Sequence, residues 1–129
     1  MCGSVFLSTL TLTPNLNELA ADITNASGAQ IDITRFFAYW VESPTSQKLD
    51  KLFLDSVEIW NRSDPDSPSD IPSAGDGNWI SAALTIPDAT TGNFIVQFQD
   101  PLEPGNYEVH IVFNTVIGSC QVSGSITLP

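Results

Sequence analysis

One stretch near the end of the chain alternates apolar and polar positions after a Pro104-Gly105 turn. Its large apolar members fall on every second position, and they are Tyr107, Val109, Ile111 and Phe113. Side chains of a β-strand project alternately to its two faces, so this pattern predicts a strand with one buried and one mostly solvated face. We expect the strand at 107–113 to be the central strand around which the others pair.

The same two-residue period recurs in short segments along the rest of the chain. The predicted strands are 5–13, 16–24, 31–41, 79–87, 94–98, 107–113 and 120–128. Residues 49–60 are predicted to form a β-hairpin around Asp55-Ser56, in preference to a short helix. In the second half of 31–41 apolar residues occupy both parities, so we expect both faces of that segment to be covered.

Eight or nine short strands with turns between them, and almost no helical periodicity, predict an all-β antiparallel sandwich. The length of 129 residues and the apolar fraction of 42% suit a single domain, 1–129, with one hydrophobic core. Residues 61–78 interrupt the pattern, because they are rich in Pro, Ser, Asp and Gly. They predict a long, polar, acidic surface loop, and loops of this length tend to be functional or mobile.

The charge balance excludes several partners. Fifteen acidic residues against four basic ones give a formal charge of −11. Nucleic acid and anionic membrane surfaces would repel such a chain. No apolar run approaches the roughly 18 residues that a membrane helix needs. The N-terminus lacks the basic region of a signal peptide, so we expect the signal of an exported protein to lie upstream of this chain.

A series of short landmarks runs along the chain. They are Cys2, Ile23-Thr24-Asn25 before Ser27-Gly28, Trp40, Ile59-Trp60, Ile86-Pro87, the alternating Phe94, Val96 and Phe98, the strand from Tyr107 to Phe113, and Cys120. In this order they resemble the immunoglobulin-like β-sandwich modules of bacterial surface, secreted or pilus-associated proteins. The turn before Tyr107 also resembles the tyrosine corner of such sandwiches, in which the phenol hydroxyl bonds back to the preceding loop backbone.

The resemblance implies an immunoglobulin-like sandwich of about 7–9 strands, located outside the cytoplasm or on the cell surface. It also implies a non-catalytic structural or adhesive role beside neighbouring domains or subunits of a surface assembly. Two other functions stay open. One is a carbohydrate-binding module, and the other is a self-assembling filament subunit whose first or last strand pairs with a neighbour's open sheet edge.

The two cysteines, Cys2 and Cys120, lie near opposite ends of the chain. The exported setting permits a disulfide between them, and closing a loop of this length would stabilise the fold by about 4–5 kcal/mol. Two alternatives remain, namely two free thiols, or a lipidated Cys2 that leaves Cys120 unpaired. Two cysteines with a single histidine do not make a zinc site.

The acidic loop and the residues beside it offer two further candidate sites. Calcium prefers oxygen ligands, and the candidate ligands are Asp64, Asp66, Asp70 and Asp76. The loop lacks the Gly and the closing Glu of a helix–loop–helix calcium site, so a solvated acidic loop is the alternative. Trp60 and Trp79 bracket the loop and could form an aromatic platform for sugar rings, although tryptophan is also an ordinary core residue of sandwiches.

Catalytic chemistry finds no support in the sequence. His110 is the single histidine, and no serine lies in a nucleophile-elbow motif. Acidic residues cluster in the predicted loop, which is a poor place to fix acid–base geometry. We therefore predict that the protein is not an enzyme.

Overall fold

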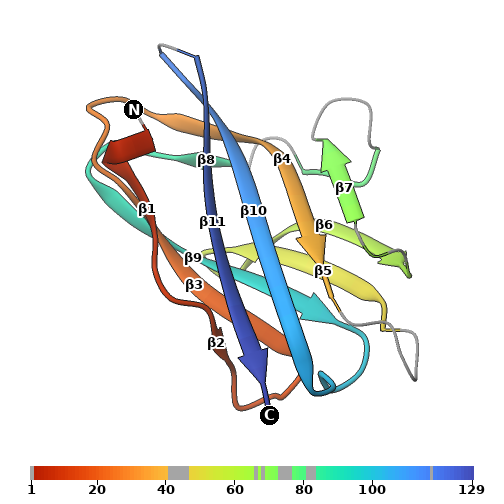
Figure 1. The fold of residues 1–129 in the computed structure, drawn as a ribbon. Coiled ribbons are helices and arrows are strands. Elements are labelled where there is room, and N and C mark those ends of the chain that lie inside the picture. The colour runs from red at the N-terminus through yellow and green to blue at the C-terminus, as the bar shows by residue number, and fades with distance from the viewer. Residues whose placement is uncertain are drawn as a thin grey trace.

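The computed structural model describes residues 2–40, 47–65, 67, 69–72, 77–80, 84–116 and 118–129. These residues form two antiparallel β-sheets that pack face to face (Figure 1). The predicted all-β antiparallel sandwich is therefore confirmed. The described part of the chain contains no helix with the length and apolar character that crossing a membrane requires.

The first sheet, sheet A, contains six strands. In sheet order they are β1 (Val5–Leu7), β3 (Glu18–Asn25), β9 (Thr90–Phe98), β5 (Leu49–Leu54) and β6 (Val57–Asp64), with β2 (Thr11–Leu12) pairing with β3 beside β1. A short 3-10 helix, η1 (Cys2–Ser4), precedes β1. The predicted strand at 5–13 is thus divided into two short strands.

The second sheet, sheet B, contains five strands. In sheet order they are β11 (Gly118–Leu128), β10 (Gly105–Thr115), β4 (Ile31–Tyr39) and β7 (Ser69–Pro72), with β8 (Thr85–Ile86) also pairing with β4. The two sheets together give eleven described strands, more than the seven to nine expected.

Two local predictions are confirmed. The strand β10 lies between β11 and β4, as its predicted central position requires, and the four alternating apolar residues from Tyr107 to Phe113 are at most 2% exposed. The hairpin of β5 and β6 turns at Asp55 and Ser56, whose φ angles are 52° and 66°. Positive φ at both central positions is the geometry of a type I′ turn, which matches the twist of the flanking strands.

A β-bulge in β4 decides which side chains face outward. Ile31 and Ile33 are buried, and after the bulge the buried parity moves to Phe36 and Ala38. The pairing with β10 shifts at the same place, since Val112 pairs with Arg35 and Phe113 with Ile33. A bulge inserts one residue and reverses the facing of all residues after it.

The bulge places Arg35, Phe37 and Tyr39 on the outer face of sheet B. Tyr39 is 43% exposed and Phe37 is half-buried. The expectation that both faces of this segment are covered is therefore wrong, because the outer face carries aromatic rings that no other described layer covers.

The predicted loop at 61–78 is also corrected. Strand β6 continues to Asp64, and β7 pairs with β4 within the same stretch. Ser69 and Ile71 are buried while Asp70 between them is exposed, so this part of the stretch follows the two-residue period of a strand. Although the stretch is mostly polar, Ile71 is buried and anchors β7 in the core.

Candidate functional site

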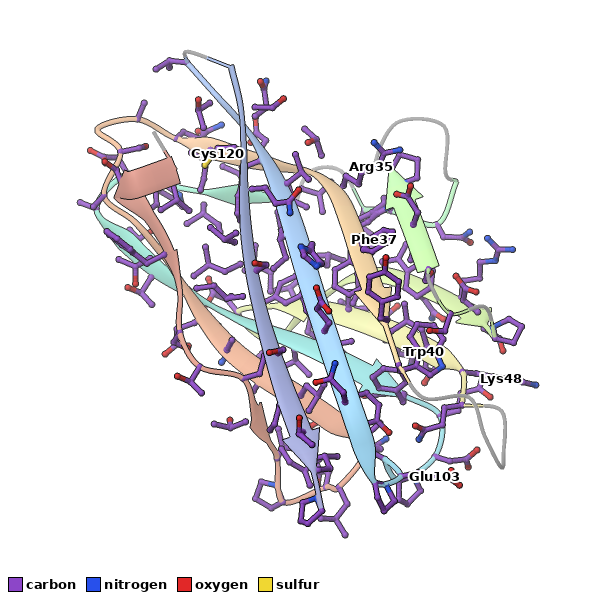
Figure 2. The ribbon with its side chains drawn as sticks, in the orientation of Figure 1. Arg35, Phe37, Trp40, Lys48, Glu103 and Cys120 are labelled. Atoms are coloured by element: carbon purple, nitrogen blue, oxygen red, sulfur yellow. The ribbon has the colours of Figure 1, made fainter. Side chains whose placement is uncertain are left out.

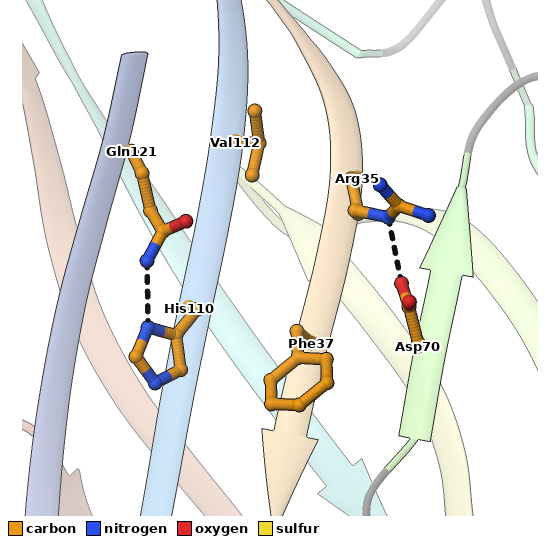
Figure 3. Close-up of a pocket in the computed structure, with 6 residues that line it drawn as sticks. All are labelled: Arg35, Phe37, Asp70, His110, Val112 and Gln121. Carbon is orange, nitrogen blue, oxygen red and sulfur yellow. Dashed lines mark hydrogen bonds and ion pairs between the residues drawn. The ribbon is translucent and has the colours of Figure 1, made fainter.

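A groove of about 240 Å³ lies on the outer face of sheet B. Four strands supply its lining, which consists of Arg35, Phe37, Asp70, His110, Val112 and Gln121 (Figure 3). Phe37 and Val112 lie in the middle of the view, and a polar pair flanks them on either side. Because the strands pair along their length, the sheet backbone fixes the spacing of these side chains.

Three rings lie next to one another on the outer face of the neighbouring strands β4 and β10. Phe37 is the middle ring, and its centroid lies 4.8 Å from that of Tyr39 and 5.7 Å from that of His110. The interplanar angles are 84° and 73°, which is the edge-to-face geometry that the aromatic quadrupole favours. Tyr39 and Phe37 share a face because they are two residues apart on one strand.

Both ring nitrogens of His110 are engaged. Its Nε2 lies 2.6 Å from Glu108 Oε1, and its Nδ1 lies 2.9 Å from Gln121 Nε2. A carboxylate only accepts hydrogen bonds, so the neutral ring carries its proton on Nε2, and Nδ1 accepts a hydrogen bond from the Gln121 amide. His110 is thereby held as an oriented polar ring, and neither nitrogen is left to activate a nucleophile.

An ion pair flanks the other side of the groove. Arg35 Nε donates to Asp70 Oδ1 at 2.7 Å, and each side chain is about half exposed. Exposed pairs of this kind contribute at most about 1 kcal/mol to stability. The pair therefore matters more for positioning a guanidinium and a carboxylate beside Phe37 than for holding the fold together.

The contact of a tyrosine corner is present at one end of the sandwich. The Tyr107 hydroxyl donates to the backbone carbonyl of Glu103 at 2.7 Å and also contacts Gln47 Oε1. Gln47 is 2% exposed, and its own amide donates to the Pro101 carbonyl at 3.1 Å. Burial raises the pKa of Tyr107, and the nearby Glu103 carboxylate also opposes its ionisation.

Of the two cysteines, only Cys120 has a described side chain. Cys120 is 3% exposed, and no described cysteine is free. Figure 2 shows Cys120 near η1, the element that begins at Cys2, and η1 contacts β11. The side chain of Cys2 lies outside the described residues, so the pairing of Cys2 with Cys120 stays a prediction.

The described residues do not bring the predicted calcium ligands together. Asp64 is 8% exposed and accepts a hydrogen bond from the Ser69 hydroxyl, whereas Asp70 lies on the outer face with Arg35. Asp66 and Asp76 lie outside the described residues. Within the described part of the chain, no group of three or more His, Cys, Asp or Glu could hold a metal ion.

The predicted sugar platform is wrong for Trp60. Its ring is 0% exposed and belongs to the core, so it offers no face to a ligand. Trp79 forms a β-bridge with Trp60 and is a partly buried residue packed against the same core. The segment between them was predicted to be a surface loop, but it contributes β7 to sheet B. The position of the two tryptophans at its ends therefore did not indicate an exposed site.

Sequence reasoning missed the groove residues other than Asp70. A usable signal was the change of apolar parity across Thr34-Arg35, from Ile31 and Ile33 to Phe36 and Ala38. Such a change with two polar residues between the apolar sets indicates a bulge. It would have assigned Phe37 and Tyr39 to the outer face.

No protein-family model matches the sequence, and no curated protein matches it. The solved structures that show weak similarity to the fold include two of one fimbrial adhesin. One is a point mutant of CfaE, the CFA/I adhesin of enterotoxigenic Escherichia coli, with 12% identity, a TM-score of 0.38, and coverage of 98% of this chain and 49% of that chain. The other is CfaE itself, the adhesive subunit of the CFA/I fimbria, with 14% identity, a TM-score of 0.35, and coverage of 97% and 48%. The chain spans about half the length of either structure.

Proposed function

We propose that the protein is a non-catalytic, extracellular adhesive module that binds its target through the outer face of sheet B. We call this surface the sheet B face and define it by Arg35, Phe37, Tyr39, Asp70, Glu108, His110, Val112 and Gln121. The observation that carries the proposal is the set of three rings on this face, of which Tyr39 is exposed and Phe37 and His110 are partly buried, with polar pairs on either side of Phe37. Exposed aromatic residues beside oriented polar groups are typical of binding surfaces.

The placement of these side chains on strands supports a binding role. Residues from β4, β7, β10 and β11 converge there, and hydrogen bonds within the face orient His110 and Arg35. A surface that is oriented before the target arrives loses less conformational entropy on binding.

The chemistry of the same face argues against catalysis. Both His110 nitrogens are occupied by Glu108 and Gln121. Ser123 is the cross-strand partner of His110 in β11, but no hydrogen bond joins its hydroxyl to the ring among the described contacts. A serine hydrolase would need that bond to activate the hydroxyl.

The test compares binding of the purified domain to a fixed set of immobilised extracellular targets. The set contains neutral and acidic glycans, collagen, fibronectin and laminin. Tyr39→Ala removes an exposed ring from the sheet B face, and Phe6→Ala is the matched control because Phe6 is 53% exposed on β1 of sheet A. We expect binding to at least one target that Tyr39→Ala abolishes and Phe6→Ala preserves. Binding that survives Tyr39→Ala unchanged would contradict the proposal.

A second candidate function is self-assembly through β11. This edge strand is eleven residues long, pairs only with β10 among the described strands, and contains no charged residue. Natural edge strands usually carry charges, prolines or bulges that prevent pairing with another chain. Light scattering at high concentration tests this function, and Ser123→Lys with Ser125→Lys is the blocking variant. A strictly monomeric wild-type protein would exclude it.

A further inference from the structure

The chemical character of the groove narrows the class of target. Its middle is apolar, formed by Phe37 and Val112 (Figure 3). On one side lie the imidazole of His110 and the amide of Gln121, and on the other the guanidinium of Arg35 and the carboxylate of Asp70. A ligand that fits must therefore combine an apolar patch with hydrogen-bonding groups around its edge.

The exposed ring of Tyr39 extends the apolar surface along β4, next to Phe37. The face of an aromatic ring carries partial negative charge and therefore attracts the weakly positive C–H groups of a saturated ring. A pyranose has this C–H face, and its hydroxyls radiate around the rim, where they can both donate and accept. Amide, guanidinium and carboxylate groups supply the matching acceptors and donors.

The negative charge of the protein favours neutral over acidic saccharides. The chain carries a net charge of −11, and Arg35, the basic residue of the groove, is already paired with Asp70. Glu108 adds a second carboxylate beside His110. Sialylated or sulfated ligands would meet unfavourable electrostatics over most of this surface.

The size of the groove favours a saccharide over a protein partner. At about 240 Å³ it is smaller than the roughly 300–1,000 Å³ of pockets for drug-sized molecules, and it lies open on a sheet. Stable protein interfaces bury about 800 Å² on each partner and centre on a larger apolar cluster than Phe37, Val112 and Tyr39 provide.

We propose that the sheet B face binds a neutral pyranose unit of a glycan, with the sugar ring stacked on the exposed ring of Tyr39 beside Phe37 and its hydroxyls bonded to Arg35, Asp70 and Gln121. This inference rests on the proposed function and assigns a ligand class to the same surface. It also replaces Trp60 and Trp79 as the aromatic residues of a sugar site.

The experiment uses an array of neutral and acidic oligosaccharides printed beside collagen, fibronectin and laminin. The domain is applied as wild type, Tyr39→Ala, Tyr39→Trp, Gln121→Ala and Phe6→Ala. A neutral glycan that binds is then titrated into the labelled protein as its methyl glycoside, with affinity measured from amide chemical shifts. Thermal melting of each variant shows that the fold is retained.

We expect binding to neutral glycans that falls about tenfold or more in Tyr39→Ala and is also weakened in Gln121→Ala. Tyr39→Trp keeps a ring at this position and should preserve binding, as should Phe6→Ala. Binding that prefers acidic glycans would overturn the inference. Binding to the proteins alone, lost in Tyr39→Ala, would overturn the glycan class and leave the proposed function standing. If no probe shows binding that depends on Tyr39, both the glycan class and the proposed function are overturned.

Discussion

The Tyr107 hydroxyl donates a hydrogen bond of 2.7 Å to the backbone carbonyl of Glu103, four residues earlier in the chain. This bond ties the turn before β10 to the strand itself. Phe98 packs edge-on against Tyr107 and Trp40, with ring centroids 5.9 and 5.4 Å apart. The corner thus joins β9, β10 and the end of β4 at one end of the sandwich.

Replacing this tyrosine should destabilise the fold. Tyr107→Phe keeps the buried ring but leaves the Glu103 carbonyl and Gln47 without their donor, so we expect the free energy of unfolding to fall by about 1–3 kcal/mol. Urea denaturation measures the change. Tyr39→Phe is the control, since it removes an exposed hydroxyl and should change stability by less than about 0.5 kcal/mol. Equal effects of the two variants would contradict the role of the corner.

The same residue predicts a pH dependence. Burial raises the pKa of Tyr107, so the folded protein holds the phenol proton more tightly than the unfolded chain, whose tyrosine pKa is about 10. The stabilisation is therefore complete below the unfolded pKa and is lost as pH rises through the folded pKa. We expect the stability difference between wild type and Tyr107→Phe to narrow above about pH 10. A difference that stays constant or widens with rising pH would contradict this assignment.

Asn25 links the end of β3 to the chain around Ala29 and to the end of β8. It is 0% exposed, and its side-chain amide donates to the carbonyls of Ala29, Ile86 and Pro87 at 2.8, 3.1 and 3.2 Å. Asn25→Ala should lower the free energy of unfolding by about 1–3 kcal/mol, because buried carbonyls lose their donor. Asn15→Ala, at an exposed position, serves as the control and should change it by less than about 0.5 kcal/mol. Chemical denaturation that shows no difference between the two variants would count against this network.

The predicted pairing of Cys2 with Cys120 has a direct chemical test. The denatured protein, alkylated without reductant and examined by mass spectrometry, should carry no alkyl group. After reduction it should carry two, and the free energy of unfolding should be about 4–5 kcal/mol lower than before. Two alkyl groups without reductant would show free thiols. One alkyl group together with a lipid mass would indicate a lipidated Cys2.

Features that depend on local pattern were predictable from the sequence. The strand from Tyr107 to Phe113 and the Asp55-Ser56 hairpin follow from a two-residue period and from turn chemistry within a few residues. The Tyr107 contact to Glu103 spans four residues and was likewise within reach of a motif.

The candidate site depends on register between distant strands, and for that reason the sequence did not reveal it. Arg35 and Asp70 are thirty-five residues apart, and they meet only because β7 pairs with β4. The extra residue at Thr34 reverses the facing of Phe37 and Tyr39, so a single unbroken period assigns them wrongly. For Trp60 the error was the opposite one, since a buried core ring was predicted to bind a ligand. Composition alone does not distinguish a core ring from a ligand-binding one.

We propose above that targets bind on the outer face of sheet B. Amide chemical-shift mapping of the isotope-labelled domain, with whichever array target it binds, tests this most directly. We expect shift changes concentrated on β4, β7, β10 and β11 around Phe37, Tyr39, His110 and Gln121, with sheet A unchanged. Changes concentrated on sheet A, or around Trp79, would contradict it.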